Sequence, residues 1–150
     1  MNALVRLSLV VAPADAGSTR PPAAPATANR SESLRVLVAD DNRDLVASTS
    51  ALLELWGHQS RTVHSGSEVL AAALAFRPDV ILLDIGLPEI DGFELARQIR
   101  AESTLDRVRL IAMTGYGQDS DRERGRNAGF DRHLVKPVHA DLLKATIEQR

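Results

Sequence analysis

The sequence predicts an α/β fold: a doubly wound, five-stranded parallel sheet with helices on both faces. From Leu34 onward, short runs rich in Val, Ile and Leu alternate with segments whose apolar residues recur at helical spacing. Strands that are apolar throughout are typical of a sheet covered on both sides. Their alternation with helices favours parallel strands joined by right-handed crossovers.

Five segments have the composition of buried strands. They are RVLVA at 35–39, SRTV at 60–63, DVILL at 79–83, RLIAM at 109–113 and RHLV at 132–135. The first predicted helix follows the first strand, because Leu45, Thr49 and Leu53 fall on one face and Gly57 is placed as a C-terminal cap. The others are predicted at 67–76, 92–100, 120–129 and 140–150. The helix at 120–129 is the weakest, since Gly125 costs about 1 kcal/mol relative to Ala in a helix interior.

The N-terminal part differs in composition. Residues 13–33 are rich in Pro, Ala, Ser and Thr and contain almost no bulky apolar side chains, which is typical of a linker. Residues 2–12 partly alternate like a short strand, but an isolated strand lacks a pairing partner. We therefore expect residues 1–33 to be a flexible segment and residues 34–150 to be the folded domain.

Composition excludes several kinds of site and partner. The 150 residues contain no cysteine, which rules out disulfides, thiolate metal sites and cysteine nucleophiles. The formal net charge of -2 does not indicate a nucleic-acid-binding protein, which would usually carry an excess of basic residues. No apolar run approaches the roughly 18 to 20 residues of a membrane helix. We expect a cytoplasmic protein, without nucleic-acid or membrane contacts, whose site uses oxygen and nitrogen groups.

Polar side chains follow four of the predicted strands. In doubly wound sheets, ligands bind beyond the carboxyl ends of the strands, so we expect these side chains to share one crevice. Clustered carboxylates repel one another unless a cation is present, and an all-oxygen cluster suits Mg²⁺. A carboxylate can also form an aspartyl phosphate when cations neutralise the phosphoryl oxygens. The residues concerned are Asp40 and Asp41, Asp84, Thr114 and Lys136.

Four motifs carry a resemblance to a known family. The segments VLVADDN, VILLDIGLPEIDGFEL, LIAMTGY and HLVKPV resemble the response-regulator receiver domain of two-component signalling, over Leu34 to about Gln149. The resemblance implies the flavodoxin-like sheet order 2-1-3-4-5 and a cis peptide bond between Lys136 and Pro137. It also implies a switch that accepts a phosphoryl group from a histidine kinase or a histidine phosphotransfer protein and performs no catalysis on an external substrate.

The resemblance further assigns a role to each site residue. By this likeness Asp84 is the phosphoacceptor, Thr114 contacts the phosphoryl group and Lys136 pairs with it. Mg²⁺ is held by Asp40, Asp41, Asp84 and the Gly86 carbonyl. The alternative is a Mg²⁺-dependent phosphohydrolase using the same aspartyl phosphate, but such an enzyme needs a second Asp two residues after the nucleophile, where this chain has Gly86.

The predicted domain ends close to Arg150, so we expect output through contacts with another protein. Two architectures fit: a single-domain regulator, or the C-terminal receiver of a hybrid histidine kinase. The segments DIGLPEIDG and GFDRHLVKPV are similar to hybrid-kinase receivers and favour the second.

Histidine replaces an aromatic residue at one position. Three residues before the strand-end Lys, receivers usually carry Tyr or Phe, whose ring swings inward on phosphorylation; here the residue is His133. Because a charged imidazole is costly to bury, we expect phosphorylation to favour a neutral, inward ring. The alternative is that His133 stays solvated and the rotamer switch is absent. His58, His64 and His139 are interpreted as surface or turn residues.

Overall fold

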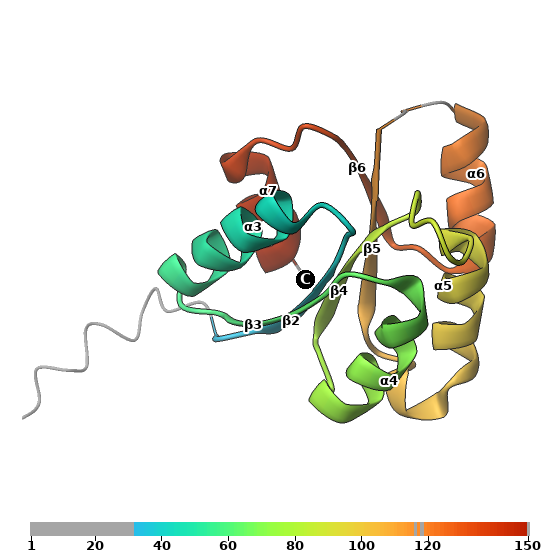
Figure 1. Ribbon diagram of the computed structural model, residues 1–150, viewed down its shortest axis with the longest axis horizontal. Coiled ribbons are helices and arrows are strands. Elements are labelled where there is room, and N and C mark those ends of the chain that lie inside the picture. The colour runs from blue at the N-terminus through green and yellow to red at the C-terminus, as the bar shows by residue number, and fades with distance from the viewer. Residues whose placement is uncertain (1–31, 116, 118, 150) are drawn as a thin grey trace, which may run out of the picture. The chain divides into compact units, whose positions relative to one another are not determined.

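A parallel sheet lies at the centre of the folded part of the chain (Figure 1). The computed structural model describes residues 32–115, 117 and 119–149. Its strands are β2 (Arg35–Ala39), β3 (Gln59–Val63), β4 (Val80–Asp84), β5 (Arg109–Thr114) and β6 (Arg132–Val135). They pair in the order β3-β2-β4-β5-β6, and every pair is parallel. In chain order this is 2-1-3-4-5, which confirms the flavodoxin-like sheet.

Helices cover both faces of this sheet. They are α3 (Arg43–Leu55), α4 (Gly66–Phe76), α5 (Gly92–Ala101), α6 (Asp119–Ala128) and α7 (Ala140–Glu148), with a short 3-10 helix, η3 (Ser103–Leu105). One apolar cluster joins α4, α5 and α6 to the sheet, and a second joins α3 and α7 to the opposite face. Figure 1 shows α3 and α7 on one side and α4, α5 and α6 on the other.

The central strand β4 is buried along its whole length. It pairs with β2 on one side and β5 on the other. Ile81 and Leu83 belong to one apolar cluster, whereas Val80 and Leu82 belong to the other. Packing on both faces therefore fixes the strand, and with it the position of Asp84 at its carboxyl end.

Local signals mark the helix ends, and Gly57 is the cap that the sequence predicts. The Asn42 side chain accepts a hydrogen bond from the Leu45 N–H at the start of α3. Gly57 follows the end of that helix with a φ of 91°, a conformation that favours glycine. At the start of α5, the Asp91 side chain caps the helix by accepting from the Phe93 N–H.

One interpretation of the sequence was wrong. His58 is only 4% exposed and is part of the interior instead of a surface or turn residue. Its Nδ1 accepts a hydrogen bond from the Leu34 N–H at 3.1 Å, and its Nε2 lies 3.2 Å from Glu148 Oε1. The ring thus ties the entry to β2 to the end of α7. His139 is exposed as expected, and His64 is half-buried.

Two predictions concern segments at the N-terminus. The strand-like run at 2–12 and all but the last two residues of the predicted flexible segment lie outside the described residues. In the part of the chain that the structure describes, no helix combines the length and apolar character needed to cross a membrane.

Candidate functional site

Three carboxylates meet at the carboxyl end of the sheet. Asp40 and Asp41 follow β2 directly, and Asp84 is the last residue of β4. One carboxylate oxygen from each lies within 4.8 Å of the others. Asp40 is 1% exposed and Asp84 is 7% exposed, whereas Asp41 is open to solvent. These distances confirm the predicted clustering of the three acids, and a cation beside them would offset the repulsion between their carboxylates.

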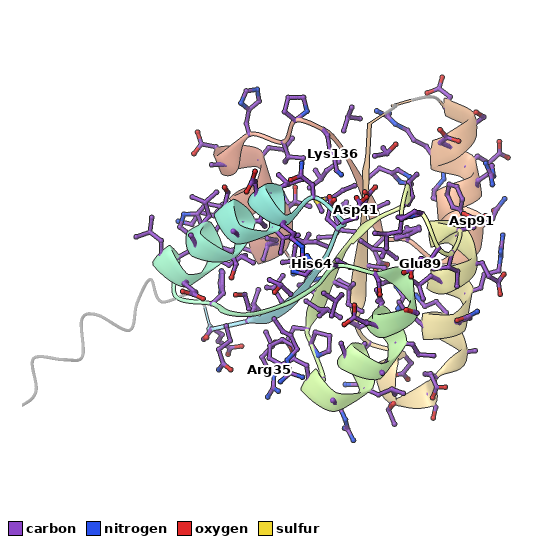
Figure 2. All side chains as sticks on the ribbon, in the orientation of Figure 1. Arg35, Asp41, His64, Glu89, Asp91 and Lys136 are labelled. Carbon is purple, nitrogen blue, oxygen red and sulfur yellow. The ribbon has the colours of Figure 1, made fainter. Side chains whose placement is uncertain are left out.

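Lys136 supplies one positive charge to this cluster. Its Nζ lies 2.5 Å from Asp40 Oδ2 and 3.2 Å from Asp84 Oδ2. Burial by itself lowers the pKa of Lys136, but the hydrogen bond to Asp40 and the charges of Asp84 and Asp40 outweigh it, and the net pKa is raised. Figure 2 shows Lys136 and Asp41 at the same end of the sheet. Asp41 has no ion-pair partner among the residues described, so its carboxylate is available to a further cation.

Backbone N–H groups orient the two buried carboxylates. The Gly86 N–H donates to Asp84 Oδ1 at 2.8 Å, and the Asn42 N–H donates to Asp40 Oδ1 at 2.9 Å. In each residue one oxygen is held by the backbone two positions ahead, while the other faces Lys136. These backbone donors were not predicted from the sequence. Their signal was present, since an Asp at the start of a turn commonly accepts from the N–H two residues on.

Thr114 ends β5 at the same edge of the sheet. The residue is buried, and its carbonyl accepts a hydrogen bond from the Lys136 N–H at 2.8 Å. This bond joins the ends of β5 and β6, so the hydroxyl-bearing and ammonium-bearing residues lie on adjacent strand ends. The Lys136–Pro137 peptide bond is cis, as the resemblance implies.

His133 lies on β6 beside α6. It pairs in register with Ala112, and its ring packs edge-on against Phe130 with centroids 5.9 Å apart. A Cβ at Gly125 would approach His133 Cε1 to 2.1 Å, so the glycine in this helix makes room for the ring. His133 Nε2 is buried and has no hydrogen-bond partner among the described groups.

The surroundings of His133 disfavour its charged form. Burial lowers its pKa from the ordinary 6.5, Arg122 and Arg126 lower it further, and Asp121 opposes them in part. Because the folded-state pKa lies below that of the unfolded chain, acidification favours protonation of the unfolded form. The contribution of His133 to the free energy of unfolding is therefore lost as the pH falls from 6.5 toward the folded pKa.

Comparisons with known proteins agree with this geometry. The family model described as response regulator receiver domain matches residues 36–148. Protein PilH from Pseudomonas aeruginosa is 33% identical over 113 residues, which cover 75% of this chain and 93% of PilH. Response regulator MprA from Mycobacterium bovis is 36% identical over 75% of this chain, which spans about half (48%) of MprA.

A solved structure carries the same fold with a metal ion. It is the receiver domain of sensor histidine kinase PA1611 from Pseudomonas aeruginosa PAO1, with a magnesium ion coordinated in its active site cleft. It is 31% identical, with a TM-score of 0.71, and the match covers 77% of this chain and 95% of that one. The family match spans the sheet, the helices and the acidic cluster, and the chain belongs to the response regulator receiver domain family.

Proposed function

We propose that this protein is a signalling switch that accepts a phosphoryl group on Asp84. The observation that carries the proposal is the pairing of Asp84 and Asp40 with one lysine at the end of a buried strand. A carboxylate oxygen of Asp84 attacks the phosphorus of the donor, and the bond from phosphorus to the donor breaks. When the donor is a phosphohistidine, the imidazole leaves and an aspartyl phosphate remains.

Lys136 and Thr114 complete the proposed chemistry. The Lys136 ammonium already lies 3.2 Å from Asp84 Oδ2, so it can neutralise an oxygen of the phosphoryl group after transfer. Thr114 is held at the adjacent strand end by its carbonyl contact with the Lys136 N–H, and its hydroxyl can donate to the same group. The backbone of Thr114 belongs to β5 and that of Lys136 is hydrogen-bonded to it, so the sheet fixes the backbone from which both side chains extend.

The donor set fits Mg²⁺. Three carboxylates with oxygens within 4.8 Å of one another are hard ligands, and we propose that Asp40, Asp41, Asp84 and the Gly86 carbonyl hold the ion. When bound, the ion neutralises phosphoryl oxygens during transfer.

Replacing Asp41 with Ala should weaken Mg²⁺ binding by at least about tenfold, because the only solvent-open carboxylate of the cluster is lost. Asp44→Ala is the matched control, since Asp44 is exposed on the first turn of α3 and lies outside the cluster. Isothermal titration calorimetry measures both variants. Equal Mg²⁺ affinity in Asp41→Ala and the unmodified protein would refute the role of Asp41.

A second candidate, a phosphohydrolase, shares the acidic cluster. Its general acid would stand at position 86, where the residue is glycine and contributes only its backbone N–H to Asp84. Incubation with acetyl phosphate separates the two functions. A switch takes up one phosphoryl group per chain and keeps it, whereas continuous release of phosphate over many turnovers would support the hydrolase.

The proposed donor is a histidine kinase or a histidine phosphotransfer protein, and the output is a contact with another protein in the cytoplasm. Both architectures expected from the sequence have counterparts among the similar proteins. PilH is matched over 93% of its length, and the PA1611 receiver belongs to a sensor histidine kinase. We propose that this chain is related to the receiver domains of hybrid histidine kinases, because its motifs DIGLPEIDG and GFDRHLVKPV are similar to theirs.

We also propose that residues 1–33 are a linker to the receiver domain, on the basis of their Pro and Ala content. Limited proteolysis should trim the chain to near Leu34 without changing the melting temperature. Cleavage beyond Leu34 should be destabilising, because its N–H donates to His58 and its carbonyl accepts from Gln59. Resistance of the first 33 residues to protease would contradict the linker assignment.

Phosphorylation should lower the pKa of His133. The ring is already packed against Phe130, and moving it further inward would increase the cost of its charge. Acid pH would then oppose activation. NMR titration with and without beryllofluoride, a phosphoryl mimic, measures this pKa, and the exposed His139 serves as the control. A pKa of His133 that is the same in both states would rule out the coupling.

A further inference from the structure

His64 lies at the acidic end of the sheet without being one of the clustered acids (Figure 2). It directly follows β3, which pairs in parallel with β2 so that Val63 stands opposite Ala39. The Asp40 N–H donates to the Val63 carbonyl at 3.3 Å, which extends this pairing by one residue. His64 is therefore the residue of the neighbouring chain segment that stands beside Asp40.

The His64 ring supplies a hydrogen bond to the backbone of Asp40. Its Nδ1 lies 3.3 Å from the Asp40 carbonyl oxygen. A carbonyl can only accept, so Nδ1 must carry the hydrogen. Among the described residues no other group donates to this carbonyl, and Asp40 is only 1% exposed. Because a buried carbonyl is costly to leave unpaired, the ring provides a donor that the sheet does not provide.

This contact bears on the direction of the Asp41 side chain. The Asp40 carbonyl and the Asp41 N–H belong to one planar peptide unit, so holding the carbonyl fixes the plane from which Asp41 extends. The Asp40 carboxylate is held separately, by the Asn42 N–H and by Lys136. The Asp41 carboxylate has no such partner in the described part of the chain, so its placement depends on the backbone that carries it.

The ring of His64 is not wedged in place by close packing. The residue is half-buried and lines a hollow of about 380 Å³ between α3 and β3, together with Val46, Ser50 and Thr62 among others. A side chain of similar size can therefore replace the ring without displacing the core. The hydrogen bond from Nδ1 is the feature that such a replacement removes.

We propose that His64 is a positioning residue for Mg²⁺ binding. Its Nδ1–H holds the peptide between Asp40 and Asp41, and this directs the Asp41 carboxylate toward the ion. His64 itself is not a ligand, since it does not belong to the group of acids whose oxygens lie within 4.8 Å of one another. The inference rests on the proposed role of Asp41 in the metal site and adds a residue that acts through it.

Isothermal titration calorimetry of the full chain with Mg²⁺ tests this role. His64→Leu removes the donor and keeps a side chain of similar size, so it should weaken Mg²⁺ binding about tenfold. His64→Asn restores an N–H donor near the position of Nδ1 and should bind within about twofold of the unmodified protein. Gln59→Leu, at the exposed opposite end of β3, is the matched control and should leave the affinity unchanged. Unchanged affinity in His64→Leu, or equal weakening in His64→Asn and His64→Leu, would overturn the inference.

A double-mutant cycle separates the positioning of Asp41 from a general loss of structure. Because His64 acts through Asp41, His64→Leu should not weaken Mg²⁺ binding further when Asp41 is already Ala. Equal weakening by His64→Leu with and without Asp41 would contradict the proposal. Melting temperatures measured with EDTA establish that each variant is folded during the titration. If Asp41→Ala alone binds Mg²⁺ as tightly as the unmodified protein, the proposed metal site fails and the role of His64 fails with it.

The tautomer of His64 gives a test that needs no metal. In the metal-free, unmodified protein at mildly alkaline pH, where an ordinary histidine is neutral, long-range ¹H–¹⁵N correlation spectra should show the ring protonated at Nδ1. A neutral ring protonated at Nε2 could not donate to the Asp40 carbonyl from Nδ1 and would also overturn the inference.

Discussion

Replacing Leu82 with Ala is expected to lower the free energy of unfolding by about 2–5 kcal/mol. Leu82 is fully buried at the centre of β4, between β2 and β5. It packs in the apolar cluster shared with α3 and α7. Because the strand is fixed on both sides, the surroundings cannot easily collapse into the space left by the shorter side chain, and the cost includes the cavity as well as lost burial.

Leu55→Ala is the matched control for this prediction. Leu55 is 78% exposed at the end of α3, so the same change of side chain should alter stability by less than about 0.5 kcal/mol. Urea denaturation followed by circular dichroism measures both variants. If the free energy of unfolding fell by similar amounts in the two variants, the tight packing of β4 that we describe would be contradicted.

Replacing Lys136 with Met is expected to lower the free energy of unfolding by about 3–5 kcal/mol at neutral pH in the absence of divalent metal. Met preserves most of the apolar stem but leaves Asp40, which is 1% exposed, without its 2.5 Å ammonium partner. The raised pKa of Lys136 sets the pH dependence of this effect. The stabilisation is complete below the ordinary value of 10.5 and disappears as pH rises through the folded pKa, so the variant and the unmodified protein should converge at strongly alkaline pH.

Lys144→Met provides the control, since Lys144 is exposed on α7 and lies 5.9 Å from the Trp56 ring. Replacing Lys144 should lower the free energy of unfolding by less than about 1 kcal/mol. Unfolding in urea with EDTA present, at neutral and alkaline pH, measures both variants. If Lys136→Met were as stable as Lys144→Met, then Lys136 would not be needed to stabilise the buried carboxylates of Asp40 and Asp84.

The strands and the acidic end of the sheet were predictable because their signals are local. The apolar run at 80–83 ends on Asp84, and the parallel topology alone brings that residue to the edge where Asp40 and Asp41 lie. The role of Gly125 was not predictable, because it depends on the ring of His133, which lies on the next strand. From the sequence alone, this glycine was expected only to destabilise its helix. In the structure, the absence of a Cβ at Gly125 leaves room for the His133 ring.

His58 was misinterpreted for a related reason. Its partners are Leu34 and Glu148, which lie 24 and 90 residues away in the sequence. Arg109 is similar, because its guanidinium donates to the carbonyls of Thr146 and Ile147 at the end of α7. Such polar contacts between distant segments leave no periodic pattern, so only the folded structure reveals them.

The central claim, that Asp84 accepts the phosphoryl group, is tested most directly by incubating the unmodified protein and Asp84→Asn with acetyl phosphate and Mg²⁺. Asn keeps the size of the side chain but lacks the nucleophilic carboxylate, and Asp44→Asn is the control at an exposed acid outside the cluster. Intact-mass spectrometry should show one added phosphoryl group on the unmodified protein and on Asp44→Asn, and none on Asp84→Asn. Undiminished labelling of Asp84→Asn would contradict the account.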